Sequence, residues 1–336
     1  MAEFSTLPVY DIDDLLSRLG SVKINNFTRL CEDDFMNRLG KLAYELAWNE
    51  KVKVIFISGP TSSGKTTFTH RLASALELYG RKSTILSMDD YYRPDVKIMT
   101  EEGMPNFETF ENLDIKGMAA DIRSLLDGKE TLLPIFDLKL RKKIKDSSRK
   151  FTLDSKGVLL VEGLHALHHD MYENLGREEY FSVFIMPYGS LMNSGRALNS
   201  EDSRLMRRLS RDWHHRGANP FATIDYWPFI RREEDKVFPE YLERADYYMN
   251  SILPYEYFVI PGMVSMYMKK DLELYEKGEL PRSVFVKNSV NLGDRDYYDL
   301  SHTISEAKRL IKLSSELPYI DLSFVPENSL LNEFIK

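Results

Sequence analysis

Residues 59–66 read Gly59-Pro60-Thr61-Ser62-Ser63-Gly64-Lys65-Thr66, a complete G-x-x-x-x-G-K-[ST] motif. The run before it, Val52 to Ser58, is apolar and rich in β-branched residues, as expected of a buried parallel strand. The run after it, Thr67 to Leu78, carries apolar residues at helical spacing. Strand, glycine-rich loop and helix in this order predict that the loop amides and the positive end of the helix bind phosphates.

The polar residues of this loop specify its chemistry. Lys65 can reach the β- and γ-phosphates of a nucleotide, and the Thr66 hydroxyl can hold Mg²⁺. The guanine-reading tetrapeptide N-K-x-D is absent from the sequence, which disfavours a GTPase. We therefore expect ATP as phosphate donor and Mg²⁺ as cofactor, with the phosphates bound by Gly59, Ser62, Ser63, Gly64, Lys65, Thr66 and Thr67.

The composition is that of a soluble globular protein. Of the 336 residues, 43% are hydrophobic and 29% are charged. The net charge of −7 argues against a general nucleic-acid binder. The single cysteine, Cys31, allows no internal disulfide, and no apolar run approaches the about 18 residues that span a bilayer. With no signal-peptide pattern at the N-terminus, we expect a cytoplasmic protein without nucleic-acid or membrane partners; a homo-oligomer stays open.

Alternating apolar strands and helices predict an α/β fold of the P-loop NTPase type, a parallel sheet flanked by helices. The expected strands are 52–58, 83–88, 131–137, 157–161 and 180–186. Ligands of such sheets bind beyond the carboxyl ends of the strands. The motifs that begin at residues 59, 89, 137 and 162 all follow expected strands, so we expect them to converge in space.

Two carboxylates follow expected strands. Asp89 is in position to orient an acceptor hydroxyl and take its proton, which is the main requirement for a kinase base. The alternative is a turn cap, and this is the better interpretation of Asp90. Glu162 ends the run Leu159-Leu160-Val161, where an acidic residue would hold Mg²⁺. Its alternative role is that of a neighbour of a helix N-cap.

Arginines recur at helical spacing near residue 210. Arg204, Arg207, Arg208 and Arg211 share one face of an expected helix, and Arg216 follows it. Side chains spaced in this way can converge on a polyphosphate. The alternative is a solvated charged face, because Glu201, Asp202 and Asp212 are interspersed.

Three further groups each have two interpretations. The basic segment 139–150 either closes over an anionic substrate or forms a solvated hairpin. His165, His168 and His169 have the helical i, i+3, i+4 spacing that could suit a metal, but no carboxylate or cysteine completes the set. A group of aromatic residues either lines a base or sugar pocket or packs in the core: Tyr91, Tyr92, Phe107, Phe110 and Phe136.

Several motifs occur together in a recognisable order. They are the loop 59–66, Asp89-Asp90-Tyr91-Tyr92-Arg93, Asn106-Phe107-Glu108, Leu133-Pro134-Ile135-Phe136-Asp137, Val161-Glu162-Gly163 and the arginine-rich segment 202–217. Over about residues 52–260 the set resembles the uridine kinase and phosphoribulokinase family of P-loop kinases. Tyr226-Trp227-Pro228 and the tail 326–331 look like the bacterial branch in which this module follows a domain similar to a threonyl-tRNA synthetase N-terminus.

The resemblance implies roles for individual residues. Asp89 would be the catalytic base, Lys65 would be a catalytic residue that binds the phosphates, and Thr66 and Glu162 would bind Mg²⁺. Arg211 and Arg216 would be lid arginines on ATP. The substrate set would comprise Tyr92, Glu108, Phe136, Arg141, Arg208 and Tyr226, with Arg208 near the sugar and Glu108 in the place of an aspartate on the ribose hydroxyls.

The departures from the family pattern concern the acceptor. Phe136 replaces a tyrosine of the base pocket, and Arg141 replaces the histidine that contacts the pyrimidine. Ala218 stands where the family has a second base-contacting arginine, and Tyr226 where it has a glutamine. A buried site that loses such hydrogen-bonding groups should change its selectivity. The phosphate end is intact while the pyrimidine end is altered.

The sequence therefore predicts an ATP-dependent kinase that transfers the γ-phosphate to a primary hydroxyl, with the 5′-hydroxyl of a nucleoside such as uridine as the family default. One alternative keeps the chemistry and takes another sugar, a polyol or a sugar phosphate as acceptor. Another is a nucleotide-binding regulatory module with little catalysis. We expect a helical appendage or linker at 1–50 and the kinase domain at 51–336, with a lid at about 201–216 and a helical extension at about 250–336.

Overall fold

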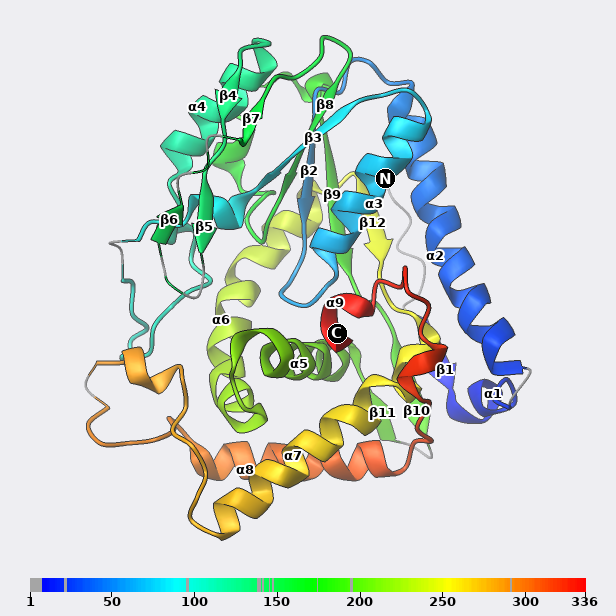
Figure 1. Cartoon of the computed structure of the whole chain (residues 1–336), viewed down its shortest axis with the longest axis vertical. Helices are drawn as coiled ribbons and strands as arrows, with labels where there is room; N and C mark the ends of the chain where they lie inside the picture. The colour runs from blue at the N-terminus through cyan, green and yellow to red at the C-terminus, as the bar shows by residue number, and fades with distance from the viewer. Residues whose placement is uncertain are drawn as a thin grey trace.

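The computed structural model describes the chain except residues 1–7, 21–22, 95–96, 138–139, 141, 145, 147, 174, 194–195 and 291. Its centre is a five-stranded sheet in the order β12-β9-β2-β8-β3, and every neighbouring pair is parallel (Figure 1). The strands are β2 (Val54–Ser58), β3 (Ser83–Ser87), β8 (Val158–Glu162), β9 (Tyr180–Met186) and β12 (Tyr247–Asn250). The predicted parallel α/β fold is confirmed.

The strands at the centre of the sheet are buried on both faces. Val54 and Phe56 of β2 belong to one hydrophobic cluster, whereas Ile55 and Ile57 belong to the other. Because successive side chains of a strand point to opposite faces, this alternation separates the two layers of core. Every residue of β2 and β8 is buried, which explains their continuous apolar sequence.

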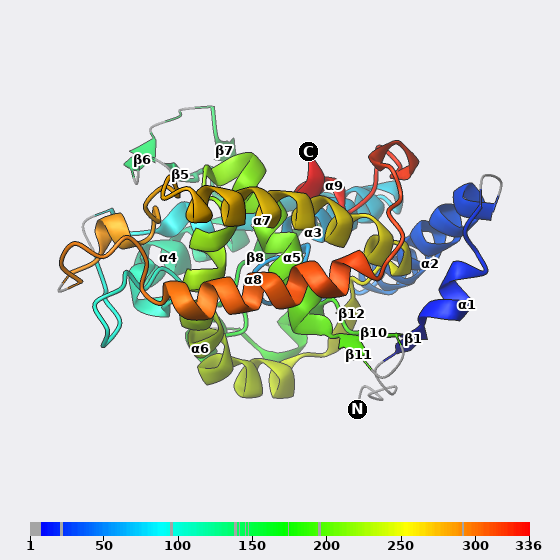
Figure 2. The same ribbon diagram turned by 90° about the horizontal axis from the view of Figure 1, so that it is seen from below.

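Helices cover both faces of the sheet (Figure 1). They are α2 (Lys23–Ala47), α3 (Lys65–Leu78), α4 (Ile115–Leu126), α5 (Ser200–Arg211), α6 (Pro220–Arg244), α7 (Ile260–Glu276) and α8 (Leu300–Ser315). Helices α7 and α8 pack side by side against α5 and α6, as Figure 2 shows from below. A short helix, α9 (Asn332–Ile335), ends the chain beside α5. In the described part of the chain, no helix is both long enough and apolar enough to cross a bilayer.

The first fifty residues contain β1 (Val9–Asp11), α1 (Ile12–Leu16) and α2. Strand β1 pairs in parallel with β10 (Ser190–Asn193), which pairs antiparallel with β11 (Arg196–Leu198). Helix α2 packs on α3 and buries Phe35 and Leu39 in the same cluster as Ile55. The division of the chain at residue 50 stays a prediction.

The predicted strand at 131–137 is wrong as a strand of the central sheet. It is interrupted before Pro134, and its two halves form separate antiparallel pairs. Strand β4 (Thr131–Leu132) pairs with β7 (Lys150–Phe151), and β5 (Ile135–Asp137) pairs with β6 (Lys142–Ile144). Proline has no amide hydrogen to donate, which excludes it from a central strand. The motif at residue 137 is therefore not at the carboxyl end of a central strand, as predicted for it. In addition, the sequence analysis did not predict β12 at the edge of the sheet.

Candidate active site

The glycine-rich loop lies between β2 and α3, at the carboxyl end of the sheet. Gly64 has a φ of 88°, a left-handed conformation that glycine adopts without strain. A Cβ at Gly59 would collide with the backbone carbonyl of Ile185 on β9. The buried hydroxyls of Ser62 and Ser63 have no hydrogen-bond partner among the described residues. An anion can therefore approach the loop backbone closely and accept hydrogen bonds from its amides and hydroxyls.

Lys65 lies at the end of this loop and is the first residue of α3. Its ammonium donates to the carbonyls of Gly59 at 2.8 Å and Pro60 at 2.9 Å. Burial lowers the pKa of Lys65, and the charges of Glu162 and Asp89 oppose that shift. Lys65, Thr66 and both carboxylates line one cavity of about 320 Å³. Three of the predicted strand-end motifs therefore converge.

The two predicted carboxylates share this cavity but differ in their contacts. Glu162 is the last residue of β8 and accepts a hydrogen bond from Ser87 Oγ at 2.8 Å. Burial raises its pKa to about 7, and the charge of Asp89 adds to the shift. Burial also raises the pKa of Asp89, while Lys65 opposes this. Both groups are acidic oxygens held near a lysine in a largely buried site, which suits proton transfer and binding of a hard cation.

Asp90 faces away from this pair. Its carboxylate accepts from the Phe136 amide at 3.1 Å and pairs with Arg149 at 2.9 Å. These contacts hold the β5 segment against the turn that follows β3. Both contacts are long-range and structural, so they differ from the local turn cap predicted for Asp90.

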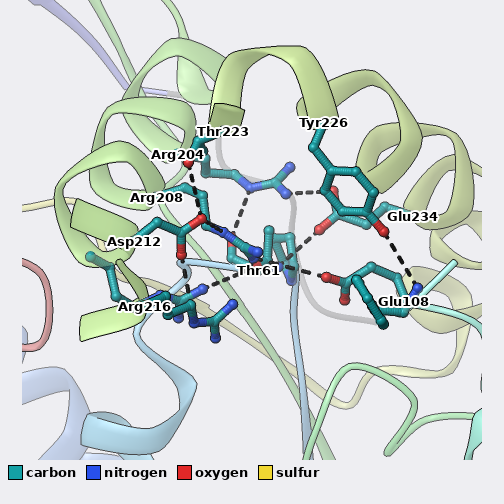
Figure 3. Close-up of polar contacts among 12 residues, drawn as sticks. Thr61, Glu108, Arg204, Arg208, Asp212, Arg216, Thr223, Tyr226 and Glu234 are labelled. Carbon is teal, nitrogen blue, oxygen red and sulfur yellow. Dashed lines mark hydrogen bonds and ion pairs between the residues drawn. The ribbon is translucent and has the colours of Figure 1, made fainter. Parts of the chain in front are cut away.

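The arginines of α5 separate into two groups. Arg204 and Arg207 are fully buried and pair with Glu234 and Glu256, respectively; Figure 3 shows the Arg204–Glu234 pair. A guanidinium in the interior needs a carboxylate partner, so these two side chains stabilise the fold. Glu234 also accepts from the Thr61 amide at 2.9 Å, so the pair is tied to the glycine-rich loop.

The other two arginines of α5, Arg208 and Arg211, line the cavity, and so does Arg216, which follows the helix. Arg208 donates to Thr61 Oγ1 at 2.7 Å and to Asp212 at 2.6 Å, and Arg211 donates to the same Thr61 oxygen at 2.9 Å. Asp212 also lies 3.5 Å from Arg216, across one turn of π-helix at Asp212–Arg216 (Figure 3). Burial lowers the pKa of Arg211 to about 9, helped by the two neighbouring arginines.

Asp212 holds two of the cavity arginines, a role that the sequence did not predict. It is buried between two arginines and accepts from the Thr223 hydroxyl at 3.2 Å. The Arg208 charge lowers its pKa although burial alone would raise it. The signal in the sequence was its spacing of four residues from both Arg208 and Arg216, which allows ion pairs on either side.

The opposite end of the cavity carries a carboxylate and an aromatic wall. Glu108 lies 3.9 Å from the Arg208 guanidinium. Tyr92 and Phe107 line the cavity beside it, together with Val284 and Phe285 from the segment between α7 and α8. The sequence did not predict these last two residues, because they lie in an irregular segment without a motif.

Two residues predicted to contact the acceptor pack behind this wall instead. The Tyr226 ring stacks on Phe285 with centroids 4.4 Å apart, and its hydroxyl donates to the Pro105 carbonyl at 2.6 Å (Figure 3 shows Tyr226). Phe136 packs against Tyr92 at 5.8 Å. Neither position follows from sequence spacing, since both depend on long-range packing. The predicted contact of Arg141 lies outside the described residues.

The histidine set is split by the structure. His165 is buried, with Nε2 2.7 Å from the Glu108 carbonyl and Nδ1 2.9 Å from the Tyr241 hydroxyl. Burial lowers the pKa of His165 to about 4, so this ring is neutral near pH 7. The potential ligand atoms of His168, His169 and Asp170 lie within 4.8 Å of one another instead. The helical spacing assumed for the three histidines is wrong, because 169–171 is a 3₁₀ turn.

Comparison with known proteins identifies the module. Residues 54–254 match the model of the phosphoribulokinase / uridine kinase family. The chain is 24% identical to uridine-cytidine kinase C of Dictyostelium discoideum over 257 residues, 74% of this chain and 49% of that protein. It is 25% identical to a uridine kinase of Lactobacillus helveticus over 206 residues, 61% of this chain and 87% of that protein.

The solved structures similar to this chain include a possible uridine kinase from Bacillus stearothermophilus. The two share 18% sequence identity with a TM-score of 0.41, over 64% of this chain and 99% of that one. The first of the curated relatives is matched over about half of its length, whereas the bacterial one is matched over most of it.

Proposed function

Because the chain belongs to the phosphoribulokinase / uridine kinase family, we propose that it transfers the γ-phosphate of ATP to a hydroxyl of a small acceptor. The observation that carries this proposal is the convergence of Lys65, Asp89 and Glu162 with three arginines in one cavity: Arg208, Arg211 and Arg216. Phosphoryl transfer is catalysed mainly by positioning and by neutralising charge, and these groups supply both. The roles given below to individual residues of the cavity are proposals that rest on this convergence.

At the donor end, the loop amides, Lys65, Arg211 and Arg216 would bind the polyphosphate. Thr66 and Glu162 would hold Mg²⁺, whose charge would neutralise the phosphates when it is bound. The residues present fit this ion, because hydroxyl and carboxylate oxygens are ligands that it prefers.

At the reacting centre, Asp89 would accept the proton of the acceptor hydroxyl as the oxygen bonds to the γ-phosphorus. The bond from that phosphorus to the β–γ bridging oxygen would break, and ADP would leave. A buried carboxylate with a raised pKa is a stronger base than an exposed one, and the charge of Lys65 nearby opposes the rise caused by burial.

At the acceptor end, Glu108 and Arg208 would bind a pair of vicinal hydroxyls. A nucleoside is the default of the family. A sugar or polyol is the second candidate, and the position of Tyr226 favours it. The Tyr226 hydroxyl donates to the Pro105 carbonyl and its ring stacks on Phe285, so this side chain is not directed at a base in the cavity. If the polar atoms of a pyrimidine find no hydrogen-bond partner in the site, the free energy lost when they leave water is not regained.

The test is a transfer screen that measures ADP release and phosphorylated product for uridine, cytidine, free sugars and polyols. The matched control is Lys65→Ala, which should lose turnover. ATP binding without transfer to any acceptor would favour the regulatory module. Efficient use of uridine with rejection of purine nucleosides would favour the family default over the sugar or polyol. We expect the activity in the cytoplasm, in line with the single Cys31, which allows no internal disulfide.

A further inference from the structure

The last helix of the chain contributes a carboxylate to the phosphate end of the cavity. Glu333, on α9, lies well beyond residue 254, where the family match ends. Its Oε2 accepts from Thr67 Oγ1 at 2.7 Å and from the Thr67 amide at 3.4 Å. Its Oε1 is 3.8 Å from Arg211 Nη1. Glu333 lines the same cavity as Lys65.

The backbone around Glu333 is firmly anchored. Leu330 and Phe334 are fully buried, and Leu330 packs against Gly64 of the phosphate loop. The Phe334 carbonyl accepts from Ser210 Oγ at 2.6 Å, and the Phe334 ring lies 5.1 Å from the Arg207 guanidinium. Figure 1 shows α9 between α5 and the start of α3. Because 19% of its side chain stays exposed, Glu333 can turn toward solvent while α9 stays in place.

The partners of Glu333 are groups that a nucleotide needs. The Thr67 amide belongs to the first turn of α3, and amides at that position of a phosphate loop hold the α- and β-phosphates. Arg211 is one of the cavity arginines assigned to the polyphosphate. A carboxylate and a phosphate carry the same sign of charge, so they cannot share these partners without repulsion.

We propose that Glu333 is an affinity-determining residue of the nucleotide site. Its carboxylate accepts from the Thr67 amide and faces Arg211, and a phosphate group that binds these partners displaces it from both. This inference rests on the proposed function, since it assumes that the cavity takes polyphosphates. It also makes the C-terminal segment part of the nucleotide site rather than an addition to the fold.

The experiment measures binding by calorimetry with the full-length protein. Its probes are ATP and inorganic tripolyphosphate, which carries the phosphates without a base. Glu333→Gln keeps the shape and removes the charge, so we expect both ligands to bind about 5- to 30-fold tighter. The matched control is Glu327→Gln, an exposed carboxylate on the same tail, which should leave both affinities unchanged. The melting temperature of the ligand-free variant should stay equal or fall slightly, because the contact with Thr67 is weakened.

Unchanged or weaker binding to Glu333→Gln would overturn the inference, since it would mean that Glu333 supports the loop or does nothing there. Tighter binding together with a lower melting temperature of the ligand-free protein excludes a general gain in stability and supports it. If the parent binds tripolyphosphate but transfers no phosphate, the kinase proposal fails while this one stands. If neither the parent nor Glu333→Gln binds either ligand, both proposals fail.

Discussion

Asp89 and Asp90 are adjacent in the chain, yet the turn after β3 gives them different environments. Asp89 lines the cavity with Lys65, whereas Asp90 bonds Phe136 and Arg149 outside it. Residue type cannot distinguish two neighbouring aspartates. What distinguishes them is the 3₁₀ turn Met88–Tyr91, which directs one carboxylate inward and the other toward β5.

We predict that Asp89→Asn lowers kcat about 10²- to 10⁴-fold, the usual contribution of a general base. Asparagine keeps the shape of the side chain but cannot take the hydroxyl proton, so ATP affinity should change little. Steady-state kinetics and calorimetry measure the two effects. Asp90→Asn is the matched control and should mainly lower stability, by about 1–3 kcal/mol, through its ion pair with Arg149. A larger loss of kcat in Asp90→Asn would reverse the assignment.

The raised pKa of Glu162 has a consequence for stability. Its ordinary pKa is 4.5, and burial raises it to about 7 in the folded protein. Between these values the folded state binds a proton that the unfolded state has released. The stability from this group is therefore complete below pH 4.5 and is lost as pH rises through 7.

The Glu162→Gln side chain cannot ionise. The free energy of unfolding of this variant should therefore rise relative to that of the parent between pH 5 and pH 8. The gain should be at most about 3 kcal/mol, from 1.36 kcal/mol per pKa unit. Urea unfolding in EDTA without nucleotide measures it. Glu101→Gln, on the surface, should follow the parent at every pH. Parallel profiles for Glu162→Gln and the parent would contradict the shift.

Helix α5 illustrates how far a periodic pattern can be interpreted. The spacing of its arginines indicated a shared face and a polyphosphate site. It did not reveal that Glu234 and Glu256 neutralise Arg204 and Arg207, because those partners come from segments far along the chain. The π-helical turn at Asp212–Arg216 was equally invisible, since its sequence continues the helical pattern.

Two arginines of this segment should therefore respond differently to alanine. Arg204→Ala leaves Glu234 buried without its partner, and we expect a loss of about 3–5 kcal/mol of stability. Arg216 is 38% exposed, so Arg216→Ala should fold normally. It should lower kcat/KM for ATP about 10- to 100-fold through the loss of a charged hydrogen bond.

Thermal unfolding and kinetics on both variants provide the measurement. Arg231→Ala on α6 removes a more exposed ion-pair network with Glu201 and Asp235 and is the control, with little effect on either quantity. A normal melting temperature for Arg204→Ala, or unchanged kinetics for Arg216→Ala, would contradict the division of the helix into a structural and a phosphate-facing group.

Across the whole molecule, the sequence predicted those elements whose pattern lies within a short stretch of chain. Strands β2 and β8 were evident from continuous apolar runs, and the phosphate loop from fixed glycines. Strand β12 was not, because four residues with two tyrosines carry too short a pattern. The residues that close the cavity, Phe285 and Glu333, have no local motif, and only tertiary packing brings them to the site.

The segment beyond residue 254 therefore contributes to the lining of the cavity. Glu333 lies at the end proposed to bind phosphates, while Val284 and Phe285 line the end proposed to bind the acceptor. The family match ends before these residues. Under the proposed function, the groups that act on the phosphates therefore lie in the matched region, while the extension contributes to the lining of the acceptor end. Selectivity for the acceptor should then depend on residues that the family pattern does not contain.

Phe285 allows this dependence to be tested. Its ring stacks on Tyr226 and lines the cavity that Glu108 also lines, so Phe285→Ala should enlarge this cavity. We predict that KM for compact sugars or polyols rises about 10-fold or more, because a ring worth about 1.5–3 kcal/mol of burial is lost from the wall. Turnover of uridine relative to those acceptors should increase, and ATP affinity should stay unchanged because the phosphate end is untouched.

The matched control is Tyr275→Ala, an exposed aromatic residue on α7 of the same extension, which should alter neither acceptor preference nor stability. The measurement is the ratio of kcat/KM for uridine to that for the best sugar or polyol, in the parent and in both variants. If Phe285→Ala leaves this ratio unchanged, the wall does not select the acceptor, and the pyrimidine-reading groups must lie elsewhere in the cavity. If the ratio rises while binding of ATP is constant, the extension determines selectivity independently of the phosphate chemistry.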